Sequence, residues 1–381
     1  MVNSFFPPWR GGAETYTYNL ARQLVQRGHE VEVFCASPPH KPGSHTVQEI
    51  RIVRLPVTTW LYGTPIMTKL PTRLLRAKAD LIHAGFPSPY NAFSASLACR
   101  PKKIPSVLTW HNDLPPLTPT ASLLVYTHDR IVLPAYVQAF RKIISTSRRY
   151  ARSSRVLKRW ASKVVIVPNG VDCERFRLDI DPTEIKHNLN LGRNGTILFV
   201  GALSKWHRYK GLDTLIEAFA LVKKQRRDII LIVVGEGSLR PYYRELASRF
   251  GLAGEVVFAG DVSDHDLPSY YTASDLLVLP SKDRSEGFGL TILEANACGK
   301  PAIGSNVGGI PDVIHHGFNG LLVPPSNPRA LSTAIGHLLG DDSLRRKMEK
   351  NSRAFAEEHD WSKIAEATER IYCEALEQNA A

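Results

Sequence analysis

The chain has 381 residues, of which 43% are hydrophobic and 22% are charged, so it is long enough for two domains and too apolar to be disordered. No apolar run approaches the roughly 18 residues of a membrane-spanning helix, and we expect no secretory signal. Five scattered cysteines without a CxxC spacing argue against a disulfide or zinc framework, so we expect a cytoplasmic protein.

The positive charge is concentrated in the first part of the chain. Residues 1–170 hold 23 Lys and Arg against 7 Asp and Glu, a net charge of +16, whereas the remainder carries −4. Nine basic residues and no acidic residue fall within 141–163. This run is compatible with a solvated helix face, with nucleic acid, or with an anionic acceptor or membrane surface. Because few aromatic residues interrupt it, we expect no nucleic-acid partner.

Short strands alternate with helices through the first 172 residues. The opening MVNS is short for a central parallel strand, so either this strand is frayed or the true start codon lies upstream. A helix is predicted over 13–28 because Leu20, Leu24 and Val25 recur at helical spacing and Gly28 is placed to end it. Further strands are predicted at Val31–Cys35, Asp80–His83, Ser106–Thr109, Lys142–Ser145 and Lys163–Pro168.

The same alternation restarts after residue 190. Strands are predicted at Thr196–Gly201, Ile229–Gly235, Glu255–Phe258, Leu276–Leu279 and Pro301–Ser305. Helices are predicted at Leu212–Lys224, Leu239–Phe250, Asp266–Ala273 and Thr291–Cys298. Alternating strands and helices indicate α/β units with parallel sheets. We therefore expect one domain over 1–172 and a second over 190–358, joined by a polar linker over 173–189.

The strongest chemical signal is segment 285–299, SEGFGLTILEANACG. Gly287 and Gly289 allow the backbone to approach a ligand closely, and a helix is predicted to begin near Leu290. The free N–H groups and positive dipole of that helix end favour an anion such as a pyrophosphate. Glu286 and Glu294 flank this turn, where each can accept hydrogen bonds from sugar hydroxyls. Either glutamate alone is equally compatible with an ordinary surface position.

This segment resembles the E-x7-E signature of the family 4 (group 1) retaining glycosyltransferases, with Glu286 and Glu294 at its ends. The resemblance extends over nearly the whole chain, because other segments are similar to family motifs and occur in the family's order. These segments are 7–14 (PPWRGGAE), 79–84 (ADLIHA), 109–113 (TWHND), 167–172 (VPNGVD), 201–211 (GALSKWHRYKG), 234–239 (VGEGSL) and 301–328.

The resemblance implies a GT-B fold, in which two Rossmann-like domains face a central cleft, with a final helix over 361–381 that packs back on the first domain. It implies transfer of a sugar from a nucleotide-diphosphate sugar to a hydroxyl of a sugar or lipid-linked acceptor, such as a cell-envelope glycan precursor. The donor is then a substrate, and neither a cofactor nor a bound metal is expected. The alternative is another GT-B enzyme, such as a sugar-nucleotide epimerase or a phosphorylase.

The resemblance also assigns roles to individual residues. The residues with implied catalytic roles are Glu286 at the donor sugar's hydroxyls, Lys210 at the donor phosphates and His111 beside the donor sugar. Glu294 would bind the ribose. Backbone amides would help to bind the donor at Gly12, Gly287, Phe288, Gly289 and Leu290. Fixed cations and N–H groups near a departing nucleoside diphosphate are the groups expected to lower the barrier most.

One position departs from the family pattern. Where the family usually has an Arg after the glycine of the first nucleotide loop, this chain has Ala202. Arg208, later in the same loop, is the candidate for the missing cation. The D-x-D sequence Asp264-His265-Asp266 resembles a metal-binding motif, but it precedes a predicted helix, so we expect Ser263 or Asp264 to cap that helix.

A membrane surface is a further expected partner. Segment 60–76 mixes apolar Trp60, Leu61, Tyr62, Ile66, Met67 and Leu70 with basic Lys69, Arg73 and Arg76. Together with the basic run 141–163, this composition favours a peripheral location at the inner face of a membrane. The alternatives are that these apolar residues pack inside the first domain and that the acceptor is a soluble sugar or metabolite.

Overall fold

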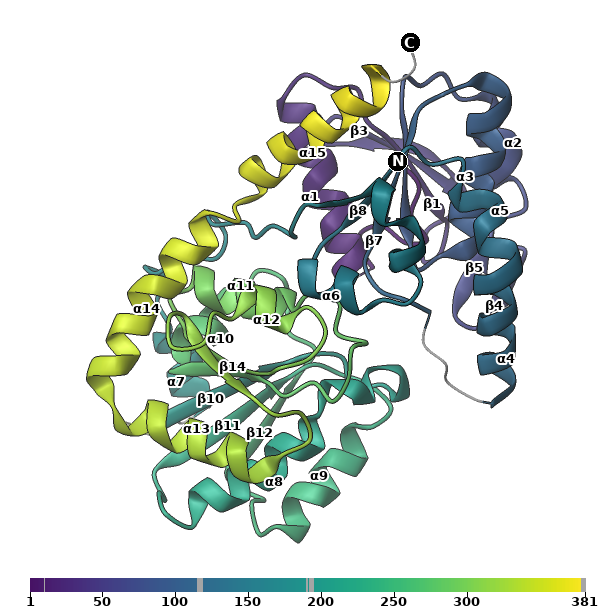
Figure 1. Ribbon diagram of the computed structural model, residues 1–381. Helices are drawn as coiled ribbons and strands as arrows, with labels where there is room; N and C mark the ends of the chain where they lie inside the picture. Colours follow the sequence, from purple (N-terminus) through teal and green to yellow (C-terminus); the bar gives the residue numbers. More distant parts are fainter. Residues whose placement is uncertain (10, 115–118, 190, 192–194, 378–381) are drawn as a thin grey trace. The chain divides into compact units, whose positions relative to one another are not determined.

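The computed structural model describes residues 1–9, 11–114, 119–189, 191 and 195–377. It divides into two compact α/β units (Figure 1): unit 1 comprises Met1–Asn169 and Trp361–Ala381, and unit 2 comprises Gly170–Asp360. Both units are built on parallel sheets, so the predicted fold class is confirmed. Across the described ranges, no helix is both long and apolar enough to cross a bilayer.

The sheet of unit 1 runs in the order β2-β3-β1, Val2, β6-β7-β8-β9. All neighbours are parallel except β2, which is antiparallel to β3. Val2 forms one bridge to Phe34 of β1 and one to Ala84 of β6, so the opening residues contribute only a minimal central strand. The strands are β1 (Glu32–Ala36), β2 (Gly43–Val47), β3 (Ile50–Leu55), β6 (Ile82–Phe86), β7 (Ser106–Trp110), β8 (Lys142–Ser145) and β9 (Val164–Ile166), with a separate hairpin of β4 (Thr59–Leu61) and β5 (Thr64–Ile66).

Helices and helical turns surround this sheet. They are α1 (Gly12–Gln26), α2 (Leu70–Arg76), α3 (Pro89–Lys102), α4 (Pro119–Thr127), the π-helical turn η1 (His128–Val132), α5 (Leu133–Val137), α6 (Arg148–Ser153), the 3-10 turn η2 (Leu157–Lys163) and α15 (Trp361–Glu377). As predicted, α1 ends just before Gly28, which adopts a left-handed φ of 90°.

The last helix, α15, packs alongside α1 (Figure 1). Trp361, Ile364, Ala365 and Thr368 recur at helical spacing and are all buried, which gives α15 one apolar face against unit 1. The Trp361 ring lies 5.6 Å from that of Tyr16 on α1. An ion pair between Lys142 and Glu374, with Nζ 2.8 Å from Oε2, adds a polar contact. Thus α15 belongs to unit 1 although it follows unit 2 in the sequence.

The sheet of unit 2 has six parallel strands in the order β12-β11-β10-β13-β14-β15. The strand order reverses between β10 and β13, and ligands of such sheets bind where the carboxyl ends of strands meet at this reversal. The strands are β10 (Gly195–Val200), β11 (Ile229–Val234), β12 (Val256–Gly260), β13 (Leu276–Leu279), β14 (Ala302–Ser305) and β15 (Gly320–Val323).

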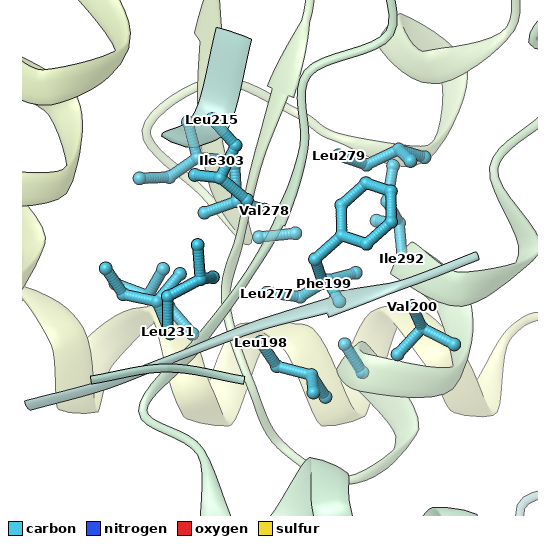
Figure 2. Packing of buried hydrophobic residues seen from close by; sticks show 14 of the residues in the cluster. Leu198, Phe199, Val200, Leu215, Leu231, Leu277, Val278, Leu279, Ile292 and Ile303 are labelled. Carbon is cyan, nitrogen blue, oxygen red and sulfur yellow. The ribbon is translucent and has the colours of Figure 1, made fainter. Parts of the chain in front are cut away.

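Helices cover both faces of this sheet (Figure 1). They are α7 (Thr183–Asn188), the 3-10 turn η3 (Lys205–Lys210), α8 (Leu212–Lys223), α9 (Arg240–Arg249), α10 (Leu267–Ala273), α11 (Leu290–Ala297), α12 (Ile310–Val313), α13 (Pro328–Gly340) and α14 (Asp342–Glu357). Figure 2 shows Leu215 of α8 and Ile292 of α11 packed with strand residues such as Leu277, all of them almost fully buried. The near-continuous apolar runs of β10, β11 and β13 are typical of strands buried on both faces.

Residues 173–189 differ from the predicted linker, because they pack as part of unit 2. Phe176 is only 2% exposed, and its ring lies 5.7 Å from that of Tyr271. Within the segment, Asp181 Oδ1 accepts a hydrogen bond of 2.9 Å from the Thr183 backbone N–H and starts α7. Ile185 and Leu189 also pack against the core of unit 2, and the polar composition of the segment hid these few apolar contacts.

Candidate active site

Two loops meet at the strand reversal of unit 2. The loop after β10 leads into η3, whose last residue is Lys210, and the loop after β13 carries Glu286. Lys210 Nζ lies 2.9 Å from Glu286 Oε2, and the two side chains are 14% and 9% exposed. Residues 76 positions apart are thus joined by a nearly buried ion pair. This is the edge of the sheet where the topology predicts a ligand.

The ion pair determines the protonation state of Lys210. Burial is the largest single influence and lowers the pKa of this ammonium, but the charges of Glu286 and its other neighbours and the hydrogen bond to Glu286 together outweigh burial, and the net pKa is raised above the ordinary value. Glu294 also raises the pKa of Lys210, which brings a second carboxylate into its electrostatic range. Lys210 is therefore a fixed cation at neutral pH. Removing either partner of such a pair leaves the other charge buried and uncompensated.

The Glu286 backbone is held by the loop after β14. Gly309 N–H donates to the Glu286 carbonyl at 3.0 Å. Gly308 has a φ of 57°, and a Cβ at this position would lie 2.1 Å from the same carbonyl oxygen. Only glycine fits such a close approach. Ser281 Oγ donates to Glu286 Oε2 at 3.3 Å, so both the main chain and the side chain of Glu286 are fixed in position.

The turn after Glu286 ends at the amino terminus of α11, as the sequence predicts. Gly289 is its N-cap residue with a left-handed φ of 100°, and no side chain caps the helix. The Phe288 side chain is buried in the core of unit 2 and only 4% exposed, so this residue can offer a ligand its backbone alone. The uncapped N–H groups that follow from Leu290 provide the positive end of a helix dipole.

Glu294 lies one turn further along α11. Tyr271 donates a hydrogen bond of 2.6 Å to Glu294 Oε2, which the sequence analysis did not anticipate. Burial raises the pKa of Glu294, although the Tyr271 bond and the charge of Arg175 lower it in part. The phenol therefore holds the carboxylate in one orientation. Tyr271 is a buried residue of α10, and a buried Tyr in a helix is ordinary. Nothing in the sequence therefore marked it as a partner of Glu294.

Arg208 is separate from the Lys210–Glu286 pair. Its guanidinium lies over the ring of Tyr242 on α9, 5.6 Å from the ring centroid, and the residue is exposed. Ala202, which stands where the family usually has an Arg, is also exposed. Arg208 thus lies on the α9 side of the loop and takes no part in the Lys210–Glu286 ion pair.

The Asp264-His265-Asp266 sequence forms a turn before α10. The N-cap residue of α10 is Asp266 rather than the expected Ser263 or Asp264, and Ser263 Oγ instead accepts from the Asp266 N–H at 3.1 Å. Arg175 binds the Asp264 carbonyl. In the described part of the chain, no group of three or more His, Cys, Asp or Glu side chains is arranged to hold a metal ion.

His111 lies at the carboxyl edge of the sheet in unit 1, directly after β7. The His111 backbone N–H donates to the Phe86 carbonyl at 3.0 Å. The His111 ring meets the Tyr16 ring edge-to-face, with centroids 4.9 Å apart. Burial lowers the pKa of His111 to about 4, so the imidazole is neutral at neutral pH. A small cavity, with room for about one water molecule, is lined by Met1, Val2, Tyr16, Thr17, His83, Gly85, Thr109 and His111.

A buried chain of hydrogen bonds runs behind this cavity. His83 Nδ1 lies 2.5 Å from the Tyr372 hydroxyl of α15, and His83 Nε2 lies 2.6 Å from Thr109 Oγ1. The Tyr16 hydroxyl is 3.2 Å from the same Thr109 oxygen. Burial lowers the pKa of His83 to about 3. His83 and Thr109 lie in segments that resemble the family, but no local pattern indicated that their side chains, on the adjacent strands β6 and β7, would be hydrogen-bonded.

Gly12 is the first residue of α1 and is exposed, and the N-cap residue Gly11 makes no side-chain cap. The preceding loop includes residue 10, which lies outside the described residues. The start of α1 therefore presents backbone N–H groups at the carboxyl edge of the unit 1 sheet, as the start of α11 does in unit 2. The predicted site residues are divided between the units: Gly12 and His111 lie in unit 1, and the other eight lie in unit 2.

Two α/β units built on parallel sheets are the architecture of the GT-B fold. Residues 181–355 match the family profile described as glycosyl transferases group 1, and residues 10–175 match the profile of glycosyltransferase family 4. D-rhamnosyltransferase WbpZ of Pseudomonas aeruginosa is 30% identical over 90% of this chain and 87% of its own length. The chain belongs to the family 4, group 1 glycosyltransferases.

Other relatives cover similar shares. O-antigen chain mannosyltransferase C of Escherichia coli is 28% identical over 94% of this chain and 92% of its own length. A GDP-mannose-dependent phosphatidylinositol monomannoside mannosyltransferase of Mycobacterium tuberculosis is 27% identical over 90% of this chain and 89% of its own length. The solved structure of Anabaena HepE in complex with UDP and glucose superposes with a TM-score of 0.78 at 22% identity, covering 98% of both chains. That likeness confirms the GT-B fold.

Proposed function

We propose that this glycosyltransferase moves a hexose from a nucleotide-diphosphate sugar to a hydroxyl of a glycan precursor, with retention of the anomeric configuration. The observation that carries the proposal is the Lys210–Glu286 pair at the strand reversal of unit 2, next to the uncapped start of α11. A fixed ammonium and free N–H groups suit a pyrophosphate, whereas carboxylates suit the hydroxyls of sugars.

In this proposal, Lys210 and the amides after Gly287 stabilise the negative charge that grows on the departing nucleoside diphosphate. Glu286 accepts hydrogen bonds from the donor sugar, and Glu294, oriented by Tyr271, accepts from the ribose. Arg208 offers a second cation for the nucleotide from the α9 side. In unit 1, the Gly12 amide helps to bind the donor and His111 contacts the donor sugar. The neutral imidazole of His111 can donate one hydrogen bond to a sugar hydroxyl and accept another.

The donor class rests on the relatives as well as on the site. One relative is named for its use of GDP-mannose, and the Anabaena protein is bound to UDP and glucose. These names support a nucleotide-diphosphate hexose as the donor, and they are compatible with either guanine or uracil as its base. We infer that retention proceeds by a front-side displacement, in which the acceptor oxygen bonds to the sugar as the bond to the nucleoside diphosphate breaks and the leaving phosphate accepts the acceptor's proton.

Two measurements test this function. Thermal unfolding with UDP, GDP and their sugars should show one nucleotide raising the melting temperature, since a ligand at about 100 times its Kd adds about 2.7 kcal/mol to the free energy of unfolding. With the matching donor, NMR of the first product should show the donor's own anomeric configuration. An inverted linkage would disprove retention, and interconversion of donor without acceptor would favour an epimerase.

We further propose that the acceptor is lipid-linked and reached at an anionic membrane. Of the apolar residues in segment 60–76, the hairpin tip Trp60, Leu61 and Tyr62 is exposed, together with Leu75 on α2, whereas Met67 and Leu70 are buried. The larger exposed apolar stretch is in α4 and η1, where Leu123 and Ile131 are 67% and 69% exposed.

This apolar stretch adjoins the basic run. Arg159 Nη1 donates to the Asp129 carbonyl of η1 at 2.7 Å, so residues 157–163 touch the exposed turn directly. Apolar residues beside exposed arginines form a surface suited to the headgroups of anionic lipids. The names of two relatives, an O-antigen chain enzyme and a phosphatidylinositol mannoside enzyme, support a cell-envelope acceptor.

A further inference from the structure

Three aromatic side chains, those of Phe5, Trp9 and Trp60, cluster on unit 1. The Phe5 and Trp9 rings lie 4.8 Å apart, and Phe5 stacks on Trp60 with ring centroids 6.1 Å apart and planes inclined by 22°. Phe5 is half-buried against the core, whereas Trp9 and Trp60 are 40% and 49% exposed. Two tryptophans, each with a large open surface, therefore flank one anchored ring.

The two tryptophans are held rather than free. Trp9 Nε1 donates to the Pro38 carbonyl at 2.5 Å. The turn that carries Trp9 is fixed by Arg54, which is 3% exposed and whose Nη2 donates to the Pro7 carbonyl at 2.5 Å. Trp60 lies on β4 opposite Pro65 of β5. The Trp9 ring is thus held by its own hydrogen bond and the Trp60 ring by stacking on Phe5, which reduces the ordering cost of binding a ligand.

The cluster lies at the carboxyl edge of the unit 1 sheet. Ala36, the last residue of β1, donates its N–H to the Ser4 carbonyl at 3.0 Å, and Ser37 N–H donates to the Leu55 carbonyl at the end of β3. Phe5 and Trp9 follow this point directly. Ligands of open parallel sheets bind outside the carboxyl ends of the strands, the edge that His111 also occupies.

We propose that Trp9 and Trp60 form a platform on which a pyranose ring of the acceptor stacks. This inference rests on the proposed function, because it assigns the acceptor's sugar to unit 1. The face of an aromatic ring is electronegative and attracts the polarised C–H groups of a sugar face. A bilayer needs exposed apolar area but no fixed ring orientation, so the stacked and hydrogen-bonded arrangement favours a sugar over a lipid surface.

Saturation-transfer difference NMR tests the platform without any transfer reaction. The probes are the methyl α-pyranosides of mannose, glucose and rhamnose at millimolar concentration, with the full-length enzyme and no donor. At least one probe should receive saturation on its ring protons. In Trp9→Ala and Trp60→Ala we expect that transfer to fall at least about threefold, because most of the stacking area is lost, and Trp9→Phe should recover part of it.

Phe250→Ala is the matched control, since Phe250 is a 42% exposed aromatic residue of unit 2 and should leave the saturation unchanged. All variants should keep the wild-type melting temperature and the wild-type shift with nucleotide, which separates failure of the platform from failure of the donor site. Undiminished saturation in both Trp variants, or none from any probe with the wild type, would overturn the proposal. Lost flotation with anionic vesicles but unchanged saturation would make the rings a membrane contact instead.

Discussion

Lys210 is the residue on which the charge chemistry of unit 2 depends, because its ammonium is buried, fixed by Glu286 and kept protonated by a raised pKa. We predict that Lys210→Ala lowers kcat at least about a hundredfold, as expected for loss of one fixed group that stabilises transition-state charge. Initial rates over a range of donor concentrations measure this. Turnover near the wild-type value would contradict the phosphate role.

The controls for Lys210→Ala come from its neighbours. Lys282 also forms a partly buried ion pair, with Nζ 2.6 Å from Asp213 Oδ2, so Lys282→Ala removes a comparable charge without touching Glu286 and should change kcat far less. Glu294→Ala should mainly raise the donor KM, since a ribose contact is made equally in the ground and transition states. Circular dichroism of all three variants separates loss of chemistry from loss of folding.

The sequence identified individual site residues of unit 2 but not the contacts between their side chains. The spacing of Glu286, Gly289 and Glu294 predicted an uncapped helix start between two carboxylates, and the structure has it. The Lys210–Glu286 contact and the Tyr271–Glu294 bond could not be predicted, because they join residues 76 and 23 positions apart. Such contacts depend on how strands order in the sheet, which no local pattern encodes.

Helix α15 is the element that closes the hydrogen-bond chain behind His111. Tyr372→Phe removes the hydroxyl 2.5 Å from His83 Nδ1 and leaves a buried ring nitrogen without that partner. We predict a loss of about 1–3 kcal/mol in the free energy of unfolding, the usual cost of an unsatisfied buried polar group. Chemical denaturation monitored by fluorescence measures the loss.

The matched control is Tyr18→Phe. The Tyr18 hydroxyl donates to Gln48 Oε1 at 2.8 Å on the surface, where water can replace the lost bond, so this variant should stay within about 0.5 kcal/mol of wild type. An equal effect of the two substitutions, or none from Tyr372→Phe, would mean that the chain behind His111 contributes nothing to stability. Normal stability in Tyr372→Phe would also weaken the case that α15 is docked by this bond.

Strands buried on both faces were the elements best predicted from the sequence. Lys142–Ser145 and Leu276–Leu279 appear with the predicted bounds, because short apolar runs between turn residues leave few alternatives. The hairpin β4–β5 was not predicted, since Thr59–Leu61 is wholly exposed and lacks a buried face. Residues 173–189 were misjudged for the opposite reason, as Phe176 and a few partly buried apolar residues hold a mostly polar segment against the core.

For the whole molecule, the distribution of charge is the feature with the widest consequence. The basic residues of 148–159 are exposed, which is compatible with the solvated face expected for any charge run. What distinguishes this run is that Arg159 binds η1, whose Ile131 and Val132 are 69% and 44% exposed. An apolar surface beside exposed arginines attracts anionic lipid by about 1 kcal/mol for each basic residue near the headgroups.

Membrane attachment of this kind predicts the outcome of liposome flotation. At low salt, recovery with vesicles should rise with anionic lipid content, and reversing four arginines of the run to glutamate should reduce it to the level of neutral vesicles. These are Arg148, Arg149, Arg152 and Arg155. The matched control reverses four exposed basic residues of unit 2, Arg329, Arg346, Lys347 and Lys350, which changes net charge equally. If attachment depended on net charge alone, both variants would lose recovery alike, and equal recovery of the wild type with neutral and anionic vesicles would exclude electrostatic attachment.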